Sequence, residues 1–215
     1  MRPNHNSLFC LLCAALAMLT GCVAPRSAVS TPAAGCQSRT AGLATAGFGG
    51  SVSEDDAFWE TDSGKQIKLG DLNGRVRVIS MFYATCQGVC VITRQDMQEI
   101  EASLSPAARE RVGFVLVTLD PTRDTAQALR AYRSAEGLSP ARWTLLRGDN
   151  AATGKLAALL GIVSGRDDSG RFVHSSELVV VDESGRIIYR HSGLRADLHD
   201  IASEVGSATL LKPNF

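Results

Sequence analysis

Several residue types are scarce in this chain of 215 residues, and each shortage excludes a class of function. There is no excess of positive charge to hold a phosphate backbone, because 22 lysines and arginines balance 22 aspartates and glutamates. Aromatic residues make up 6%, too few for a surface on which bases stack. Six cysteines are too few for a scaffold held together by disulfides. With 45% hydrophobic residues, the composition is that of a globular protein.

Long apolar runs are also lacking, apart from one near the N-terminus. Residues 8–19 are apolar and uncharged and follow Arg2. A membrane-spanning helix needs about 20 such residues, whereas this shorter run suits the core of a signal peptide. It ends in Leu-Thr-Gly-Cys at Cys22, which resembles a bacterial lipobox. We expect a lipoprotein signal peptide over 1–21 and a lipidated Cys22 that tethers the protein to a membrane of the bacterial cell envelope, facing the periplasm. An ordinary signal peptide is the alternative.

Composition divides the rest of the chain into three parts. Residues 22–53 are rich in Ala, Gly, Ser, Thr and Pro, and predict a flexible tether. This tether carries Cys36, for which the sequence gives no structural role. Residues 54–206 hold the only folded domain that we expect, and 207–215 form a C-terminal tail.

The folded domain shows strands and helices in alternation. Asp124 and Thr125 have short side-chain oxygens that can cap the helix after them. The order is a β-hairpin, then three β-α units, then a second hairpin and a helix, which predicts an α/β thioredoxin-like domain with a central mixed sheet flanked by helices. Strands are expected at 58–61, 66–69, 75–82, 112–119, 143–146, 177–182 and 186–191, and helices at 89–104, 126–135, 151–160 and 195–205.

Two cysteines, Cys86 and Cys90, lie between the first core strand and the following helix. Four residues are about one helical turn, so both sulfurs can point the same way if Cys90 lies in the first turn. The helix N-terminus and the cation of Arg94 would lower the thiol pKa values. Such a pair forms a disulfide or binds a soft metal. A disulfide with a purely structural role would contribute little, because the loop it closes is very short.

Three segments of the domain carry a family resemblance. Residues 82–90 read Phe-Tyr-Ala-Thr-Cys-Gln-Gly-Val-Cys, residues 119–125 read Leu-Asp-Pro-Thr-Arg-Asp-Thr, and residues 172–175 read Phe-Val-His-Ser. In this order they resemble the strand–loop–helix motif, the Asp-Pro-x-Arg-Asp-Thr segment and the His-Ser segment of the Sco/SenC family. That family comprises copper proteins of cytochrome c oxidase assembly, and the likeness spans about residues 54–195.

The resemblance implies a copper site formed by Cys86, Cys90 and His174, in which the two cysteines also form a redox-active pair. Cu(I) is a soft ion that suits thiolate and imidazole ligands. A site with three ligands and no evident fourth suits transfer of the metal better than its storage, because a partner's ligand can enter before the others leave. The resemblance also implies delivery of copper to the CuA centre of cytochrome c oxidase subunit II, or reduction of the cysteines of that centre.

The chain departs from the family pattern at three positions. Gln87 and Val91 stand where prolines usually follow the cysteines, and Val173 stands where an acidic residue commonly precedes the histidine. These changes bear on the metal affinity and the redox potential. Other candidate ligands are expected to lie elsewhere, with Met81 and Met97 in the core and His191 and His199 on the surface.

The main alternative is an exported thiol–disulfide oxidoreductase. Those enzymes usually carry Cys-x2-Cys and a facing cis-proline, whereas this chain has three residues between its cysteines and no proline between Pro140 and Pro213. A peroxidase is disfavoured, because Thr85 is adjacent to Cys86 instead of a turn before it. A membrane-tethered redox or copper sensor stays open.

Overall fold

The structure is a computed structural model that describes residues 49–166, 168, 172–195 and 198–210. These residues belong to one compact unit, Leu43–Phe215. The predicted signal peptide, Cys22 and Cys36 lie outside the described residues. Among the described residues, every helix is too short or too polar to cross a bilayer.

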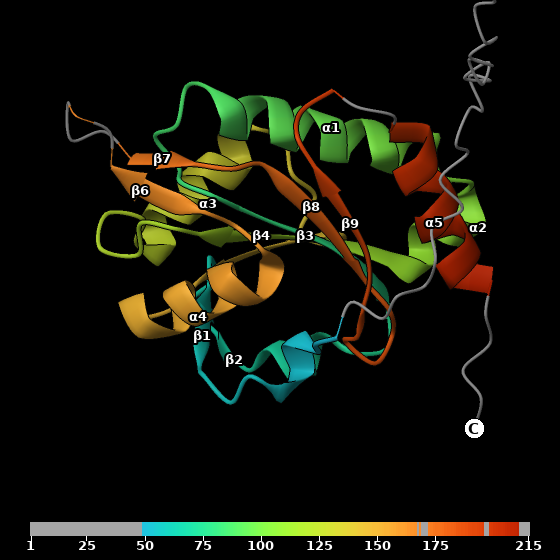
Figure 1. Ribbon diagram of the computed structural model, residues 1–215, viewed down its shortest axis with the longest axis horizontal. Coiled ribbons are helices and arrows are strands. Elements are labelled where there is room, and N and C mark those ends of the chain that lie inside the picture. Colours follow the sequence, from blue (N-terminus) through green and yellow to red (C-terminus); the bar gives the residue numbers. More distant parts are fainter. Residues whose placement is uncertain (1–48, 167, 169–171, 196–197, 211–215) are drawn as a thin grey trace, which may run out of the picture. The chain divides into compact units, whose positions relative to one another are not determined.

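A seven-stranded mixed sheet lies at the centre of the unit, in the order β2-β1-β5-β4-β3-β8-β9 (Figure 1). The middle strands β3, β4 and β5 run parallel, whereas β1, β8 and β9 are antiparallel to their neighbours. The strands are β1 (Trp59–Thr61), β2 (Gln66–Ile67), β3 (Val76–Phe82), β4 (Val112–Thr118), β5 (Trp143–Arg147), β8 (Glu177–Val181) and β9 (Ile187–Ser192).

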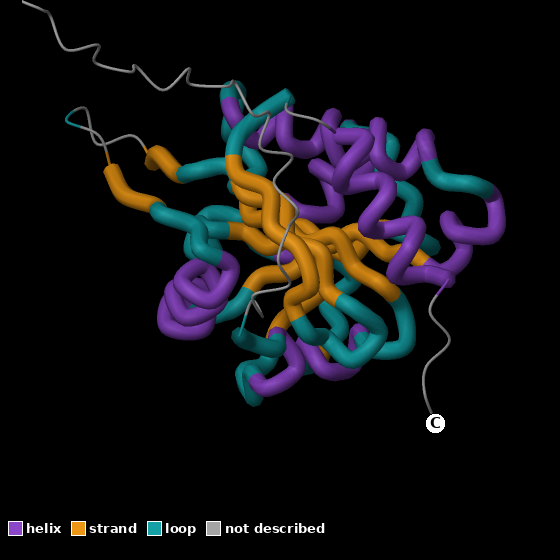
Figure 2. Tube along the Cα trace, turned by 45° about the vertical axis from the view of Figure 1, so that its right-hand side comes forward, coloured by secondary structure: helices purple, strands orange, loops and turns teal. Residues whose placement is uncertain are grey.

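Helices cover both faces of this sheet, as Figure 2 shows. The helices α1 (Val89–Ser103), α3 (Ala126–Ala135) and α5 (Leu198–Leu210) bury their apolar side chains against one face. The helix α4 (Asn150–Leu160) covers the other face together with two 3-10 helices, Val52–Glu54 and Leu69–Leu72. Every residue of β4 is buried, as expected of a central strand covered on both sides. The predicted α/β arrangement of a mixed sheet flanked by helices is therefore confirmed.

The edges of the folded domain differ from the prediction. At the N-terminal edge, Val52 is already buried in a 3-10 helix (Val52–Glu54), and its amide donates to the carbonyl of Gly185 at 2.9 Å. At the other edge, α5 continues to Leu210, four residues beyond the predicted end of the domain. A second 3-10 helix, Leu69–Leu72, begins where the strand predicted at 66–69 would end.

One helix and one pair of strands were not predicted. The helix α2 (Pro106–Arg111) begins after Ser105, whose side chain accepts a hydrogen bond from the amide of Ala108 at 3.2 Å. This Ser-Pro start is a signal that the sequence does contain. The strands β6 (Ser164–Arg166) and β7 (Phe172–His174) form a separate antiparallel pair that carries His174 at its end.

Candidate metal centre

The dithiol loop joins the C-terminal end of β3 to the start of α1. Its first turn is closed by the amide of Cys86, which donates to the carbonyl of Tyr83 at 3.1 Å. Gly88 is the N-cap residue of α1, so Cys90 is the second residue of the helix and lies in its first turn, as predicted. Cys90 is only 2% exposed, whereas Cys86 is half-buried, and both are free thiols. The two sulfurs therefore differ in their access to solvent.

A buried carboxylate, that of Asp124, is hydrogen-bonded to this loop. Asp124 is 2% exposed, and its Oδ2 accepts hydrogen bonds from the amide of Ala84 at 2.9 Å and from the hydroxyl of Thr118 at 2.5 Å. Burial raises the pKa of Asp124, although these two donors act in the opposite direction. Of the two residues predicted to cap α3, Thr125 does so, while Asp124 anchors the dithiol loop. In the sequence, the place of Asp124 in the family-like segment 119–125 was the feature that could have indicated this role.

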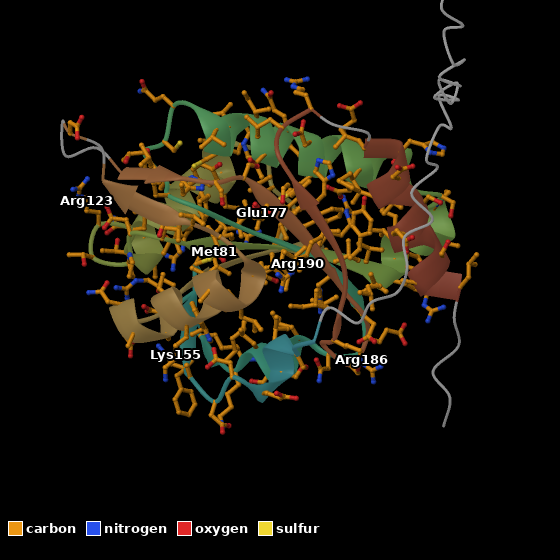
Figure 3. The ribbon with its side chains drawn as sticks, viewed as in Figure 1. Met81, Arg123, Lys155, Glu177, Arg186 and Arg190 are labelled. Carbon is orange, nitrogen blue, oxygen red and sulfur yellow. The ribbon has the colours of Figure 1, made fainter. Side chains whose placement is uncertain are left out.

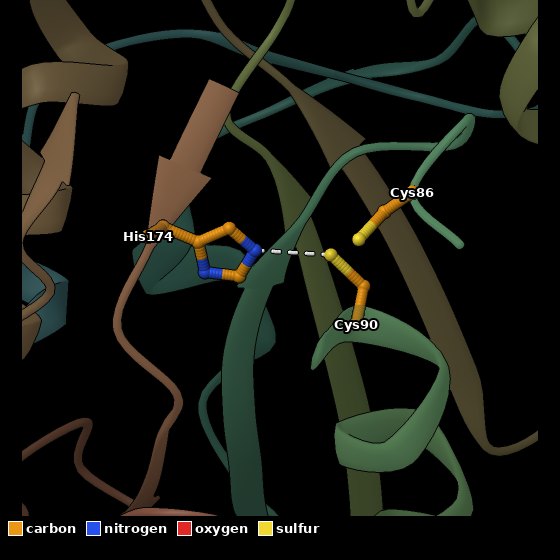
Figure 4. A group of neighbouring side chains, drawn as sticks. All are labelled: Cys86, Cys90 and His174. Carbon is orange, nitrogen blue, oxygen red and sulfur yellow. Dashed lines mark hydrogen bonds between the residues drawn. The ribbon is translucent and has the colours of Figure 1, made fainter. Parts of the chain in front are cut away.

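His174 approaches the sulfurs from β7. Its Nε2 lies 3.0 Å from the Sγ of Cys90 (Figure 4). Its Nδ1 lies 2.8 Å from the carbonyl oxygen of Ser175. A carbonyl can only accept, so Nδ1 carries the proton and Nε2 presents its lone pair to the sulfur. Burial lowers the pKa of His174, with the Ser175 carbonyl opposing it, which keeps the ring neutral at pH 7.

The pKa values of the two cysteines are shifted in opposite directions. Desolvation opposes ionisation of Cys86, but hydrogen bonds from the Cys90 thiol, the amides of Gly88 and Cys90 and the Tyr83 hydroxyl outweigh it and lower the pKa. Burial, followed by the hydrogen bond to Cys86, raises the pKa of Cys90 well above its usual value. Cys86 therefore ionises before Cys90, which holds its proton more tightly.

The prediction that the helix N-terminus and Arg94 lower both thiol pKa values is wrong for Cys90, whose pKa is raised. Arg94 has other partners. Its guanidinium pairs with Glu136 at 2.8 Å and donates to Gln98 at 2.6 Å. Glu136 and Gln98 hold the guanidinium of Arg94, because a buried arginine needs a carboxylate and hydrogen-bond acceptors close by. Hydrogen bonds to its sulfur lower the pKa of Cys86 instead.

The site opens into a cavity of about 540 Å³. Val173, which is 47% exposed, stands at its rim where the family commonly has an acid. The Tyr83 ring meets that of His174 edge-on, with centroids 6.0 Å apart. None of the described side chains that line the cavity belongs to an aspartate, glutamate, lysine or arginine: Tyr83, Thr85, Cys86, Gln87, Val89, Val173 and His174.

The other candidate ligands lie away from this group. Met81 and Met97 are buried in the two apolar layers on either side of the sheet, and Met81 is labelled in Figure 3. His199 is exposed as predicted, with its Nδ1 4.0 Å from a carboxylate oxygen of Asp200. His191 on β9 is half-buried, although we expected it on the surface. Within the described residues, Cys86, Cys90 and His174 alone form a cluster suited to a metal ion, with ligand atoms within 4.8 Å of one another.

The fold and the site together define a thioredoxin-like protein with a dithiol–imidazole centre. The SCO1/SenC family matches residues 56–209, well over half of the chain, and the protein belongs to this family.

A curated relative from Stutzerimonas stutzeri bears the name "Putative copper-binding protein". It is 29% identical over 120 residues, which are 54% of this chain and 57% of that protein. The match therefore spans less than two thirds of the length of the relative.

Solved structures share the fold. A SCO1/SenC family lipoprotein from Bacillus anthracis is 21% identical with a TM-score of 0.63, covering 70% of this chain and 91% of that chain. The copper-bound structure of ScoI from Bradyrhizobium japonicum is 20% identical with a TM-score of 0.58, covering 71% and 96%. At these identities, the likeness establishes the fold.

Proposed function

We propose that this protein is a membrane-tethered copper metallochaperone that assists assembly of the CuA centre of cytochrome c oxidase. It would bind Cu(I) through Cys86, Cys90 and His174. The proposal is carried by one observation: two sulfurs and an imidazole nitrogen lie within 4.8 Å of one another, although His174 is 84 residues away from Cys90 in sequence.

The chemistry of these donors fits Cu(I) better than a hard cation. Thiolate sulfur is soft and imidazole nitrogen is intermediate, while Mg²⁺ and Ca²⁺ select oxygen ligands. His174 already presents an unprotonated Nε2, fixed by its bond to the carbonyl of Ser175. The lowered pKa of Cys86 supplies one thiolate, and metal binding would displace the proton from Cys90.

The exposure of the site suits a metal that is passed on. Cys86 is half-buried and lines the open cavity, whereas Cys90 is nearly inaccessible. A ligand of a receiving protein could reach the metal from the Cys86 side before His174 and Cys90 release it. Membership of the SCO1/SenC family supports the CuA centre of oxidase subunit II as the recipient.

The membrane tether is part of the same proposal. Cleavage before Cys22 and lipidation of its sulfur would hold the domain at a membrane on the periplasmic side. The lipobox-like Leu-Thr-Gly-Cys tetrad supports this, as does a SCO1/SenC relative described as a lipoprotein. Mass spectrometry of the protein purified from bacterial membranes would detect diacylglycerol on Cys22, and Cys22→Ser should release the protein into the soluble fraction.

Copper titration of the reduced domain tests the metal assignment. We expect one Cu(I) per chain, measured against a chromogenic Cu(I) chelator, and X-ray absorption should show two sulfur scatterers and one imidazole nitrogen. His174→Ala should weaken binding at least tenfold, in the range seen when the groups around a metal are altered. His191→Ala is the matched control, because it removes another half-buried imidazole. Equal affinities for the two variants would refute the ligand assignment.

A second function, thiol–disulfide exchange, is favoured by the asymmetry of the two thiols. The Cys86 thiolate could attack a target disulfide, and Cys90 would then release the reduced target by closing the Cys86–Cys90 disulfide. Two electrons pass to the target, and its released cysteines take up two protons. Reduction of insulin by the metal-free dithiol would show this activity, and a rate equal to that of Cys86→Ser would exclude it.

A further inference from the structure

Two buried hydroxyl groups connect the cysteine helix to the histidine segment. The Oγ1 of Thr93 on α1 lies 2.7 Å from the Oγ of Ser176, and the two residues are 83 positions apart in sequence. Thr93 is 3% exposed and Ser176 is 8% exposed. Thr93 stands one helical turn after Val89 and three residues after Cys90, while Ser176 follows His174 by two residues.

The direction of this hydrogen bond follows from counting protons. Thr93 has one hydroxyl proton, which it donates to the carbonyl of Val89 at 3.0 Å. The proton between the two hydroxyls must therefore come from Ser176, with Thr93 as the acceptor. A continuous chain of bonds then runs from Ser176 through Thr93 to Val89, which is the first residue of α1 and the neighbour of Cys90.

The histidine segment is fixed on its other side as well. The amide of Ser175 donates to the carbonyl of Val163 at 2.8 Å, and the Oγ of Ser175 accepts from the amide of Val163 at 3.1 Å. These bonds tie the histidine segment, residues 172–176, to Val163 just before β6, but they do not join it to α1. The contact between Ser176 and Thr93 supplies that connection from a residue two positions after His174.

We propose that the hydroxyl pair of Thr93 and Ser176 is a positioning clamp that holds His174 against the dithiol and so sets the affinity for Cu(I). This inference rests on the proposed copper function. Neither hydroxyl touches the metal ligands, so both residues act through the placement of the ring. Without the clamp, the histidine segment keeps its bonds to Val163 and to the amide of Gly193 but loses its hydroxyl bond to α1, so the distance of the ring from the Sγ of Cys90 is held less tightly.

Three variants test the clamp by Cu(I) affinity. Thr93→Val keeps the shape of the side chain and removes the acceptor, Ser176→Ala removes the donor, and the double variant removes both. Each should bind Cu(I) about tenfold more weakly, as when groups that orient a ligand are lost. The double variant should be no weaker than the singles, because all three lose the same bond. Thr93→Ser restores the hydroxyl and should restore the affinity.

The control is Thr153→Val on α4. Thr153 is also a buried threonine within a helix, but its Oγ1 has no hydrogen-bond partner among the described residues. This variant should bind Cu(I) like the wild type. If Thr93→Val folds poorly, Ser176→Ala still decides the question, because it leaves the bond from Thr93 to Val89 intact.

A measurement on the metal-free protein separates this inference from the copper proposal. The ring ¹⁵N shifts of His174 should move in Thr93→Val and in Ser176→Ala but stay unchanged in Thr153→Val. In a His174→Ala background, Thr93→Val should cause no further loss of Cu(I) affinity. Wild-type shifts and affinity in both hydroxyl variants, or a loss that persists without His174, would overturn the clamp. A wild-type protein that binds no Cu(I) would refute the copper function, while the shifts would still test the clamp.

Discussion

Removal of the Asp124 carboxylate should both destabilise the fold and loosen the dithiol loop. Asp124→Ala leaves two donors unpaired, the half-buried amide of Ala84 and the fully buried hydroxyl of Thr118. An unpaired buried polar group costs about 1–3 kcal/mol, and the half-buried amide belongs near the lower limit. Relief of the desolvated charge offsets part of this cost. We therefore expect a loss of about 2–3 kcal/mol in the free energy of unfolding.

Thermal and urea unfolding of the metal-free reduced domain measure this loss. For a domain of this size, about 2–3 kcal/mol corresponds to a fall in Tm of roughly 5–10 °C. Thr125→Ala is the control, because it removes the adjacent N-cap of α3, which costs about 1 kcal/mol, without touching the dithiol loop. Asp124→Ala should also weaken Cu(I) binding, whereas Thr125→Ala should not. Equal destabilisation by both variants, with unchanged copper affinity, would refute the anchoring role of Asp124.

The pH dependence of stability gives a second test of this carboxylate. Burial raises the pKa of Asp124 in the folded protein above its ordinary value of 3.8. The folded state therefore binds the proton more tightly than the unfolded state, and protonation stabilises the fold. This contribution is complete below about pH 4 and is lost as the pH rises through the folded pKa. Relative to Asp124→Asn, which stays neutral, the wild type should lose stability as the pH rises from 4 to 7. A difference that does not change with pH would contradict the burial argument.

Three further predictions follow from the site and the core. Iodoacetamide should label Cys86 at a pH below the usual thiol range while Cys90 stays protected, and peptide mapping would measure the two. Equal labelling of both cysteines would contradict the opposite shifts of their pKa values. Burial lowers the pKa of His174 below its ordinary value of 6.5, so the neutral ring predominates between pH 6.5 and 8. The Cu(I) affinity should rise over that range because the thiols ionise, and the rise should be as steep in His174→Ala as in the wild type. A shallower rise in His174→Ala would mean that the imidazole titrates. Leu129→Ala on α3 should cost about 2–5 kcal/mol in urea unfolding, because Leu129 is fully buried; a loss below 1 kcal/mol would place it outside the core.

Local patterns in the sequence were enough to predict most elements of the fold. The apolar spacing from Val89 and the capping oxygen of Thr125 placed α1 and α3 to within a residue. The apolar run at 112–119 predicted the strand β4, which the structure buries along its whole length. These features depend on neighbours within one or two turns of the chain, so their periodicity is visible without the tertiary structure. The short α2 and the β6–β7 pair carry too few residues for a period to show.

The sequence by itself determined that the chain has two cysteines one helical turn apart at a strand–helix junction, and a histidine in a family-like segment far downstream. Only the tertiary structure decided that the Nε2 of His174 lies 3.0 Å from Cys90, that Arg94 pairs with Glu136, and that Asp124 anchors the loop. Each of these facts depends on which strands lie next to each other and which groups are buried between them. Burial also separates the two thiols, because desolvation depends on the atoms packed around a sulfur and not on its place in the chain.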